Sequence, residues 1–170
     1  MSFIDLAHAR FSVRKFASTP VEPEKIEKIL EAGIVAPTAK NAQPVKIWVI
    51  ESEEALEKVR QTTSCHFDAP VIFAIGGLNE AAWIRPADGK SFVDIDASIV
   101  ATHMMLEIHD LGLGSTWVGW FDSPALKAAF PEMEPYEMVA LLPVGYPAED
   151  AEPSPRHTQY KPKDELVGRL

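Results

Sequence analysis

The stretch PTAKNAQP, residues 37–44, separates a helical pattern over residues 23–35 from a strand-like run over residues 45–50. Apolar residues recur at helical spacing in the first segment, whereas the last is a short apolar run. A helix, a loop of small and polar residues and a buried strand predict a place where backbone can approach a flat ligand closely. The same loop also suits a capped connection in which Asn41 and Gln43 satisfy turn backbone.

A second stretch, RFSVR at residues 10–14, carries two arginines around a serine. If this stretch is extended, the side chains of residues 10, 12 and 14 point to one side, because side chains alternate along extended backbone. Arginine binds phosphate bidentately, and a serine hydroxyl adds a neutral donor. The pattern suits an anionic cofactor or substrate. Its alternative is a pair of solvated charges that flank a turn.

Together these stretches resemble the flavin-dependent nitroreductase family, in which an R-x-S-x-R-like start is followed by a helix and a P-[ST]-x-x-N-x-Q-P-like loop. The segment GSTWVGW, residues 114–120, looks like the family strand that passes the flavin ring. The segment LPVGYP, residues 142–147, resembles the family's late G-Y-P segment. Arg156 follows at a distance similar to that of the family's C-terminal phosphate contact. The resemblance extends over nearly the whole chain.

The resemblance implies an α+β, nitroreductase-like fold of three layers, with a central, mostly antiparallel mixed sheet flanked by helices in an intertwined homodimer. A length of 170 residues with 46% hydrophobic content predicts one domain over residues 1–170. Residues 94–111 predict a long helix that is apolar almost all round and so buried on both sides, within the core or against another subunit. We also expect an exposed helix over 53–62 and a buried strand over 70–75.

The resemblance further implies that the cofactor is FMN, and that Arg10, Ser12 and Arg156 meet its phosphate. Arg14 corresponds to the family's basic residue near the pyrimidine edge of the flavin, where a positive charge stabilises the reduced ring. The full set of residues expected to bind the cofactor is Arg10, Phe11, Ser12, Arg14, Pro37, Thr38, Ala39, Asn41, Gln43, Val118, Gly119 and Arg156.

The remaining expected contacts come from two loops. Thr38 and Asn41 are expected to touch the ring or ribityl chain from the partner subunit, and the backbone around Val118 and Gly119 to donate a hydrogen bond to flavin N5. A small residue at 119 is consistent with that close approach. Many family members have an amide side chain that contacts the flavin just before the second strand; this chain has Gln61–Thr63 there, and we assign none of them to that contact. No residue is assigned as catalytic, because the flavin carries the redox chemistry.

The implied activity is an NAD(P)H-dependent FMN oxidoreductase with ping-pong kinetics. Hydride passes from a nicotinamide cofactor through FMN to a small electrophilic acceptor, such as a nitroaromatic or a quinone. The loop over residues 78–93, which contains Trp83, is where we expect acceptor specificity to reside. The alternatives are a flavin-binding protein that stores or senses flavin, or a family member with dehydrogenase or dehalogenase chemistry.

Composition argues against several other classes of partner. A formal net charge of −9 disfavours nucleic acid and anionic membrane surfaces. His103 and Glu107 share a helical neighbourhood but do not supply three metal ligands, so we expect no metal site. Cys65 is the one cysteine and cannot form an internal disulfide. With no apolar N-terminal run visible, the expected compartment is the cytoplasm.

Overall fold

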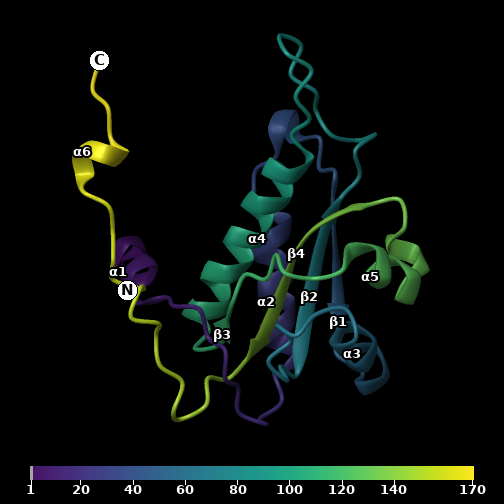
Figure 1. Ribbon diagram of the computed structural model, residues 1–170, viewed down its shortest axis with the longest axis vertical. Coiled ribbons are helices and arrows are strands. Elements are labelled where there is room, and N and C mark those ends of the chain that lie inside the picture. Colours follow the sequence, from purple (N-terminus) through teal and green to yellow (C-terminus); the bar gives the residue numbers. More distant parts are fainter. Residues whose placement is uncertain (1) are drawn as a thin grey trace.

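The computed structural model describes residues 2–170, and within them a four-stranded sheet is flanked by helices (Figure 1). The strands are β1 (Val45–Ile50), β2 (Val71–Gly77), β3 (Gly114–Ser115) and β4 (Glu137–Gly145). The α-helices are α1 (Phe3–Ala9), α2 (Pro23–Ile34), α3 (Glu53–Arg60), α4 (Val93–Asp110), α5 (Ser123–Ala129) and α6 (Lys163–Leu166). Two short 3-10 helices complete the described elements, η1 (Ala39–Asn41) and η2 (Pro131–Met133).

The strands lie in the order β1-β2-β4-β3, and each neighbouring pair is antiparallel. β2 is central, and all seven of its residues are buried. It runs through Gly76 and Gly77, which the sequence pattern treats as the end of the strand. A Cβ atom on Gly77 would lie 2.3 Å from Cγ2 of Val93, the first residue of α4. Glycine at this position therefore lets the start of α4 lie close against the sheet.

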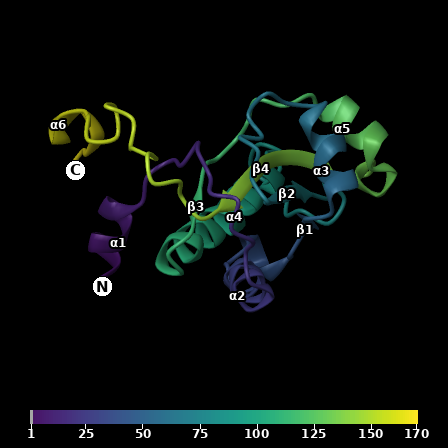
Figure 2. The ribbon, with the colours of Figure 1, turned by 90° about the horizontal axis from the view of Figure 1, so that it is seen from below.

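Helices cover both faces of the sheet and give the expected three layers (Figure 2). Alternate residues of β2 point to opposite faces. Phe73 and Ile75 pack with residues of α2 and α4, whereas Ile72 and Ala74 pack with residues of α3 and α5. The predicted α+β class is confirmed, with antiparallel pairing in every strand ladder of the described chain.

The long helix α4 is buried along one face only. Ala97, Ala101, Met104 and other residues of that face pack into the core, whereas Ile99 and Leu106 remain half-buried. Burial on both sides, which the sequence predicts, is therefore not reached within one chain. The second apolar face of α4 is left partly open.

Most predicted elements occupy their expected ranges, with two kinds of difference. Helices over 23–35 and 53–62 and the strand over 45–50 are present, although the helices end one or two residues early. The expected strand over 114–120 is wrong for most of its length, because only Gly114 and Ser115 form a ladder with β4. The seven-residue helices α1 and α5 were not predicted, although a capping box of Ser2 and Asp5 starts the first and Asp122 caps the second.

The chain beyond β4 runs past α1 and extends away from the sheet (Figure 1). Tyr160, Leu166 and Val167 in this tail are exposed. Among the described residues, no helix has both the length and the apolar character needed to cross a membrane.

Candidate functional site

The basic stretch of residues 10–14 forms no helix and lies against β3. Arg10 caps the C-terminal end of α1, and Ser12 then forms a parallel bridge with Ser115. The amide of Val13 donates to the carbonyl oxygen of Ser115 at 2.9 Å, and the Val13 side chain is buried. Arg14 is exposed and its Nη1 donates to the carbonyl oxygen of Ser12 at 3.3 Å. The stretch therefore buries Val13, its fourth residue, and leaves Arg14 exposed and Arg10 half-buried.

The C-terminal segment brings Arg156 to the same side of the molecule. The ring of the next residue, His157, lies 6.3 Å from the ring of Phe11 in an edge-on arrangement. Nε2 of His157 also lies 3.1 Å from the carbonyl oxygen of His8. Arg156 is exposed in a turn. Residues separated by about 145 positions in the sequence thus meet beside α1, and both Arg10 and Arg156 belong to this region.

The positive charge of this region acts on a histidine at the end of α4. The pKa of His109 lies below its usual value of 6.5, first because the ring is partly buried and second because the Arg10 guanidinium repels a proton on it. The neighbouring Asp110 carboxylate opposes the shift but does not cancel it. Arg10 therefore lies near the C-terminal end of α4.

The segment after β3, residues 116–120, leaves the sheet but remains hydrogen-bonded to β4 at Val118. The amide of Val118 donates to the carbonyl oxygen of Leu141 at 2.9 Å, and the Leu141 amide donates back at 3.0 Å. Gly119 is exposed, and a Cβ atom built on it would meet no heavy atom within 4 Å. Since the Val118 amide already donates to Leu141, Gly119 is the next position at which a ligand can reach the backbone. Trp120 beyond it is 77% exposed.

The stretch Gln61–Thr63 lies beside this segment. The hydroxyl of Thr63 donates to the carbonyl oxygen of Trp120, and the amide of Asp122 donates to the carbonyl oxygen of Thr62 at 2.8 Å. Thr62 and Thr63 are both buried. Sequence reasoning left Gln61–Thr63 open, and the structure places Thr62 and Thr63 as supports of the backbone that follows Gly119.

The late segment that resembles the family's G-Y-P motif contacts the chain between the basic stretch and α2. The carbonyl oxygen of Tyr146 accepts from the amide of Ala17 at 2.8 Å. The phenol of Tyr146 donates to the carboxylate of Glu22 and accepts from Nζ of Lys25 at 2.6 Å. This contact raises the pKa of Lys25. Tyr146 therefore ties the end of β4 to the start of α2.

The loop of residues 37–44 has an unusual backbone. Lys40, Asn41 and Gln43 have φ angles of 53°, 56° and 50°, in the left-handed region that side chains other than glycine rarely adopt. Each such residue costs on the order of 1–2 kcal/mol. The Gln43 amide donates to the hydroxyl of Thr38 at 3.0 Å, and Nε2 of Gln43 donates to Oδ1 of Asn41 at 3.1 Å. The loop is thus strained and braced by its own polar side chains.

A buried carboxylate, missed by the sequence reasoning, holds the start of this loop. Oδ1 of Asp96 in α4 accepts a hydrogen bond from the amide of Ala39 at 2.9 Å. Asp96 is 1% exposed. No local signal separates Asp96 from the exposed Asp94 in the same turn, because carboxylates are common in the first turn of a helix.

One chain does not bring the two sequence motifs together. The loop of residues 37–44 is fixed at Asp96, near the N-terminal end of α4, whereas the basic stretch lies at the C-terminal end near His109 (Figure 1). These two helix residues are thirteen positions apart, which is roughly 20 Å along the axis. The arginines and the loop therefore form two separate groups, one at each end of α4, whereas Val118 and Gly119 follow β3, where Val118 pairs with Leu141 of β4.

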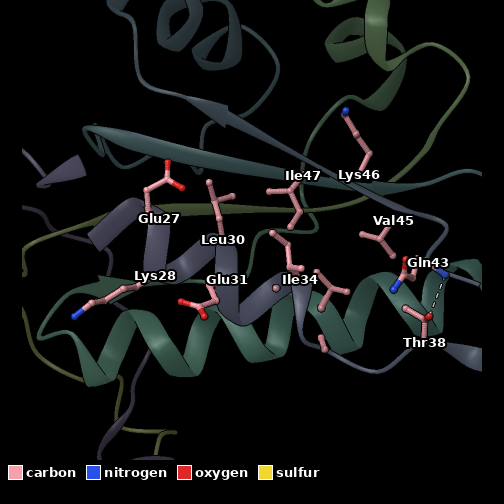
Figure 3. Close-up of a pocket in the computed structure, with 13 residues that line it drawn as sticks. Glu27, Lys28, Leu30, Glu31, Ile34, Thr38, Gln43, Val45, Lys46 and Ile47 are labelled. Carbon is pink, nitrogen blue, oxygen red and sulfur yellow. Dashed lines mark hydrogen bonds between the residues drawn. The ribbon is translucent and has the colours of Figure 1, made fainter. Parts of the chain in front are cut away.

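A cavity of about 660 Å³ lies between α2 and the edge strand β1 (Figure 3). It is lined by Leu30, Ile34 and Ile47 among others, and Thr38 and Gln43 stand at one end of it. The arginines of the basic stretch, Val118 and Gly119 do not line it. The cavity is therefore distinct from the phosphate-binding region that the sequence predicts. Among residues 2–170, no group of three or more potential metal ligands is present.

An antiparallel sheet between helix layers, with a basic stretch at one end of the central helix and a strained small-residue loop at the other, differs from the parallel, doubly wound sheet of a Rossmann domain. The family model described as "Nitroreductase family" matches residues 7–67 and 64–146. The chain belongs to the nitroreductase family.

Three similar proteins show how far the likeness extends. A nitroreductase family protein from Clostridium difficile 630, solved as a crystal structure, is 37% identical, with a TM-score of 0.92, and the match covers 99% of this chain and 98% of that one. The structure of an FMN-dependent nitroreductase from Clostridium difficile R20291 is 25% identical with a TM-score of 0.74, over 89% and 91% of the two chains. An NADPH-flavin oxidoreductase from Vibrio harveyi is 24% identical, over 89% of this chain and 67% of its own.

Proposed function

We propose that this protein is an FMN-dependent oxidoreductase that moves hydride from NAD(P)H to a small electrophilic acceptor, such as a nitroaromatic or a quinone, by a ping-pong mechanism. Relatives named FMN-dependent nitroreductase and NADPH-flavin oxidoreductase support the cofactor and the enzyme class. When bound, FMN supplies the redox chemistry by accepting a hydride from one substrate and passing it to the next. The protein binds and orients both partners.

The observation that carries the proposal is the composition of the two groups at the ends of α4. At one end, Arg10, Ser12 and Arg156 offer two guanidinium groups and a hydroxyl to a phosphate, in a chain whose net charge of −9 otherwise repels anions. Arg14, fixed at the Ser12 carbonyl, is the charge that we assign to the pyrimidine edge. A positive charge there stabilises the reduced ring and makes hydride acceptance easier.

The backbone around Gly119 is the part that fits the flavin ring. Its outward side is open, and the Val118 amide is already donated to Leu141. We therefore assign the hydrogen bond to flavin N5 to the amide of Gly119. The hydroxyl of Thr63 holds the next carbonyl group, so the donor is presented by a fixed backbone.

We propose that a second copy of the chain completes the site. The wall formed by Pro37, Thr38 and Asn41 lies at the far end of α4 from the arginines, so one chain cannot present both groups to one flavin. Exposed apolar residues support such a homodimer. Phe3 is 69% exposed and Ile34 is 72% exposed, and the second apolar face of α4 is half-buried. Burying these surfaces would favour association.

The proposal places the protein in the cytoplasm as a single domain. A lone half-buried cysteine, Cys65, suits a reducing compartment in which disulfides do not persist. Both hydrophobic clusters rest on the one sheet, one on each face, which supports a single folding unit.

Anaerobic spectroscopy tests the reaction directly. Purified protein loaded with FMN is mixed with NADH or NADPH, and the flavin absorbance in the visible region is followed. We expect bleaching by at least one of the two and recovery of the colour on addition of a nitroaromatic or a quinone. A flavin that stays oxidised with both nicotinamides would favour the alternative of a storage or sensing protein.

A further inference from the structure

Asp96 has a buried carboxylate in which one of the two oxygens accepts a hydrogen bond. Oδ1 accepts from the Ala39 amide at 2.9 Å, and the residue is 1% exposed. Oδ2 is sealed from solvent and has no hydrogen-bond partner within the described chain. A buried charge that lacks partners is costly, so a carboxylate at this position calls for a reason beyond packing. Its one hydrogen bond goes to the loop of residues 37–44.

The first turn of α4 makes a firm base for this contact. Val93 packs closely against Gly77 of β2, and the Asp96 amide donates to the Phe92 carbonyl oxygen at 2.8 Å. The positive end of the helix dipole favours a negative charge in this turn. The carboxylate is therefore held by the sheet-packed helix, and its partner in the hydrogen bond is the loop.

The loop needs such an external hold. Three of its residues, Lys40, Asn41 and Gln43, are in the left-handed region, and two of its hydrogen bonds join loop residues to one another. Strained backbone persists only where its surroundings fix it. The bond from Ala39 to Asp96 joins the start of the strained segment to a separate element, directly after Thr38 and before Asn41.

We infer that Asp96 is a positioning residue for the flavin site: its carboxylate holds the Ala39 amide and thereby sets the shape in which Thr38 and Asn41 meet the flavin. The inference rests on the proposed function, because it takes this loop to be the flavin wall. Asp96 does not touch the cofactor itself. Its effect on the flavin passes through one backbone hydrogen bond.

Two substitutions of Asp96 separate the hydrogen bond from the charge. Asp96→Ala removes the acceptor of the Ala39 amide, whereas Asp96→Asn keeps an oxygen that can accept it. Loss of a hydrogen bond to a charged group corresponds to about tenfold or more in an equilibrium constant. We expect the FMN dissociation constant of Asp96→Ala to rise by about tenfold or more, with a changed visible circular dichroism spectrum of bound FMN. Asp96→Asn should stay within about threefold of the wild type.

Asp94 supplies a matched control, because it carries the same carboxylate in the same turn but is exposed. Asp94→Ala should change neither the affinity nor the spectrum. Titrations are made at a temperature at which each apoprotein is fully folded, so that a loss of global stability does not enter the comparison. If folded Asp96→Ala binds FMN with wild-type affinity and spectrum, the inference is wrong. It is equally wrong if Asp96→Asn is as impaired as Asp96→Ala.

If Asp96→Ala does not fold, a substitution of the donor residue, Ala39, tests the same hydrogen bond. Ala39→Pro removes the amide hydrogen, and the extended backbone of Thr38, with φ −126° and ψ 157°, is compatible with a following proline. We expect it to weaken FMN binding as Asp96→Ala does. If Ala39→Pro binds FMN with wild-type affinity, the inference about Asp96 is wrong, but the proposed function is unaffected. Failure of the wild-type protein to bind FMN would overturn the proposed function, and this inference with it.

Discussion

Replacing Gly119 by alanine should weaken FMN binding without destabilising the fold, because this position faces open space in the apoprotein. A Cβ atom there meets no heavy atom within 4 Å, and the residue is exposed. The free energy of unfolding of the apoprotein should therefore stay within about 0.5 kcal/mol of the wild type. The same methyl group occupies room that we assign to the flavin, and one extra methyl group at a close contact costs about 1–3 kcal/mol. FMN binding should weaken by roughly 5- to 150-fold.

Gly114→Ala is the matched control, since here the added methyl group strikes the protein itself. Its Cβ atom would lie 2.5 Å from Cγ2 of the buried Val13. We expect it to destabilise the apoprotein by about 1–3 kcal/mol. Urea unfolding of the apoproteins measures stability, and fluorescence titration measures FMN affinity. If Gly119→Ala binds FMN as tightly as the wild type, the flavin does not approach the backbone at this point.

Three further predictions concern other parts of the account. Arg10→Ala should weaken FMN binding by about 1.5–3 kcal/mol in the same titration, as expected for a lost charged hydrogen bond, and unchanged affinity would remove Arg10 from the phosphate site. Arg14→Ala should lower the reduction potential of bound FMN with a smaller loss of affinity; behaviour like that of Arg10→Ala would assign both arginines to the phosphate. The pKa of His109 is lowered in the folded protein, so the unfolded chain binds the proton more readily as the pH falls below 6.5. The free energy of unfolding should therefore decrease as the pH is lowered through this range. Urea unfolding at several pH values should show a weaker decrease in His109→Gln, and an identical decrease would contradict this assignment.

Local patterns were enough to predict the main scaffold of the fold. The apolar spacing of residues 23–35 and 94–111 predicts helices, and the short apolar runs at 45–50 and 70–75 predict strands of a covered sheet. The structure has these elements at residues 23–34, 93–110, 45–50 and 71–77. These signals are local, since each depends on residues a few positions apart. The sequence predicts that α4 is buried on both sides, within the core or against another subunit, and a single chain covers one of its faces. Composition says that a face is apolar, but it does not say which molecule covers it.

The supports of the site could not be predicted in this way. Asp96 meets Ala39, and Thr63 meets Trp120, across 57 sequence positions in both cases. Such contacts depend on how the elements pack, which no local pattern records. The strand expected over 114–120 failed similarly. After Ser115 the described backbone pairs with β4 at Val118 alone, and whether a segment pairs along its whole length is decided by the partner strand.

The central claim is that each flavin site combines the arginines of one chain with the loop of another, and mixed dimers test it most directly. One chain carries Arg10→Ala and a differently tagged chain carries Thr38→Ala with Asn41→Ala. A heterodimer purified through both tags then has one intact site only if the two groups come from different chains. We predict one tightly bound FMN per heterodimer and weakened binding in both homodimers. A heterodimer that binds FMN no better than either homodimer would contradict the account.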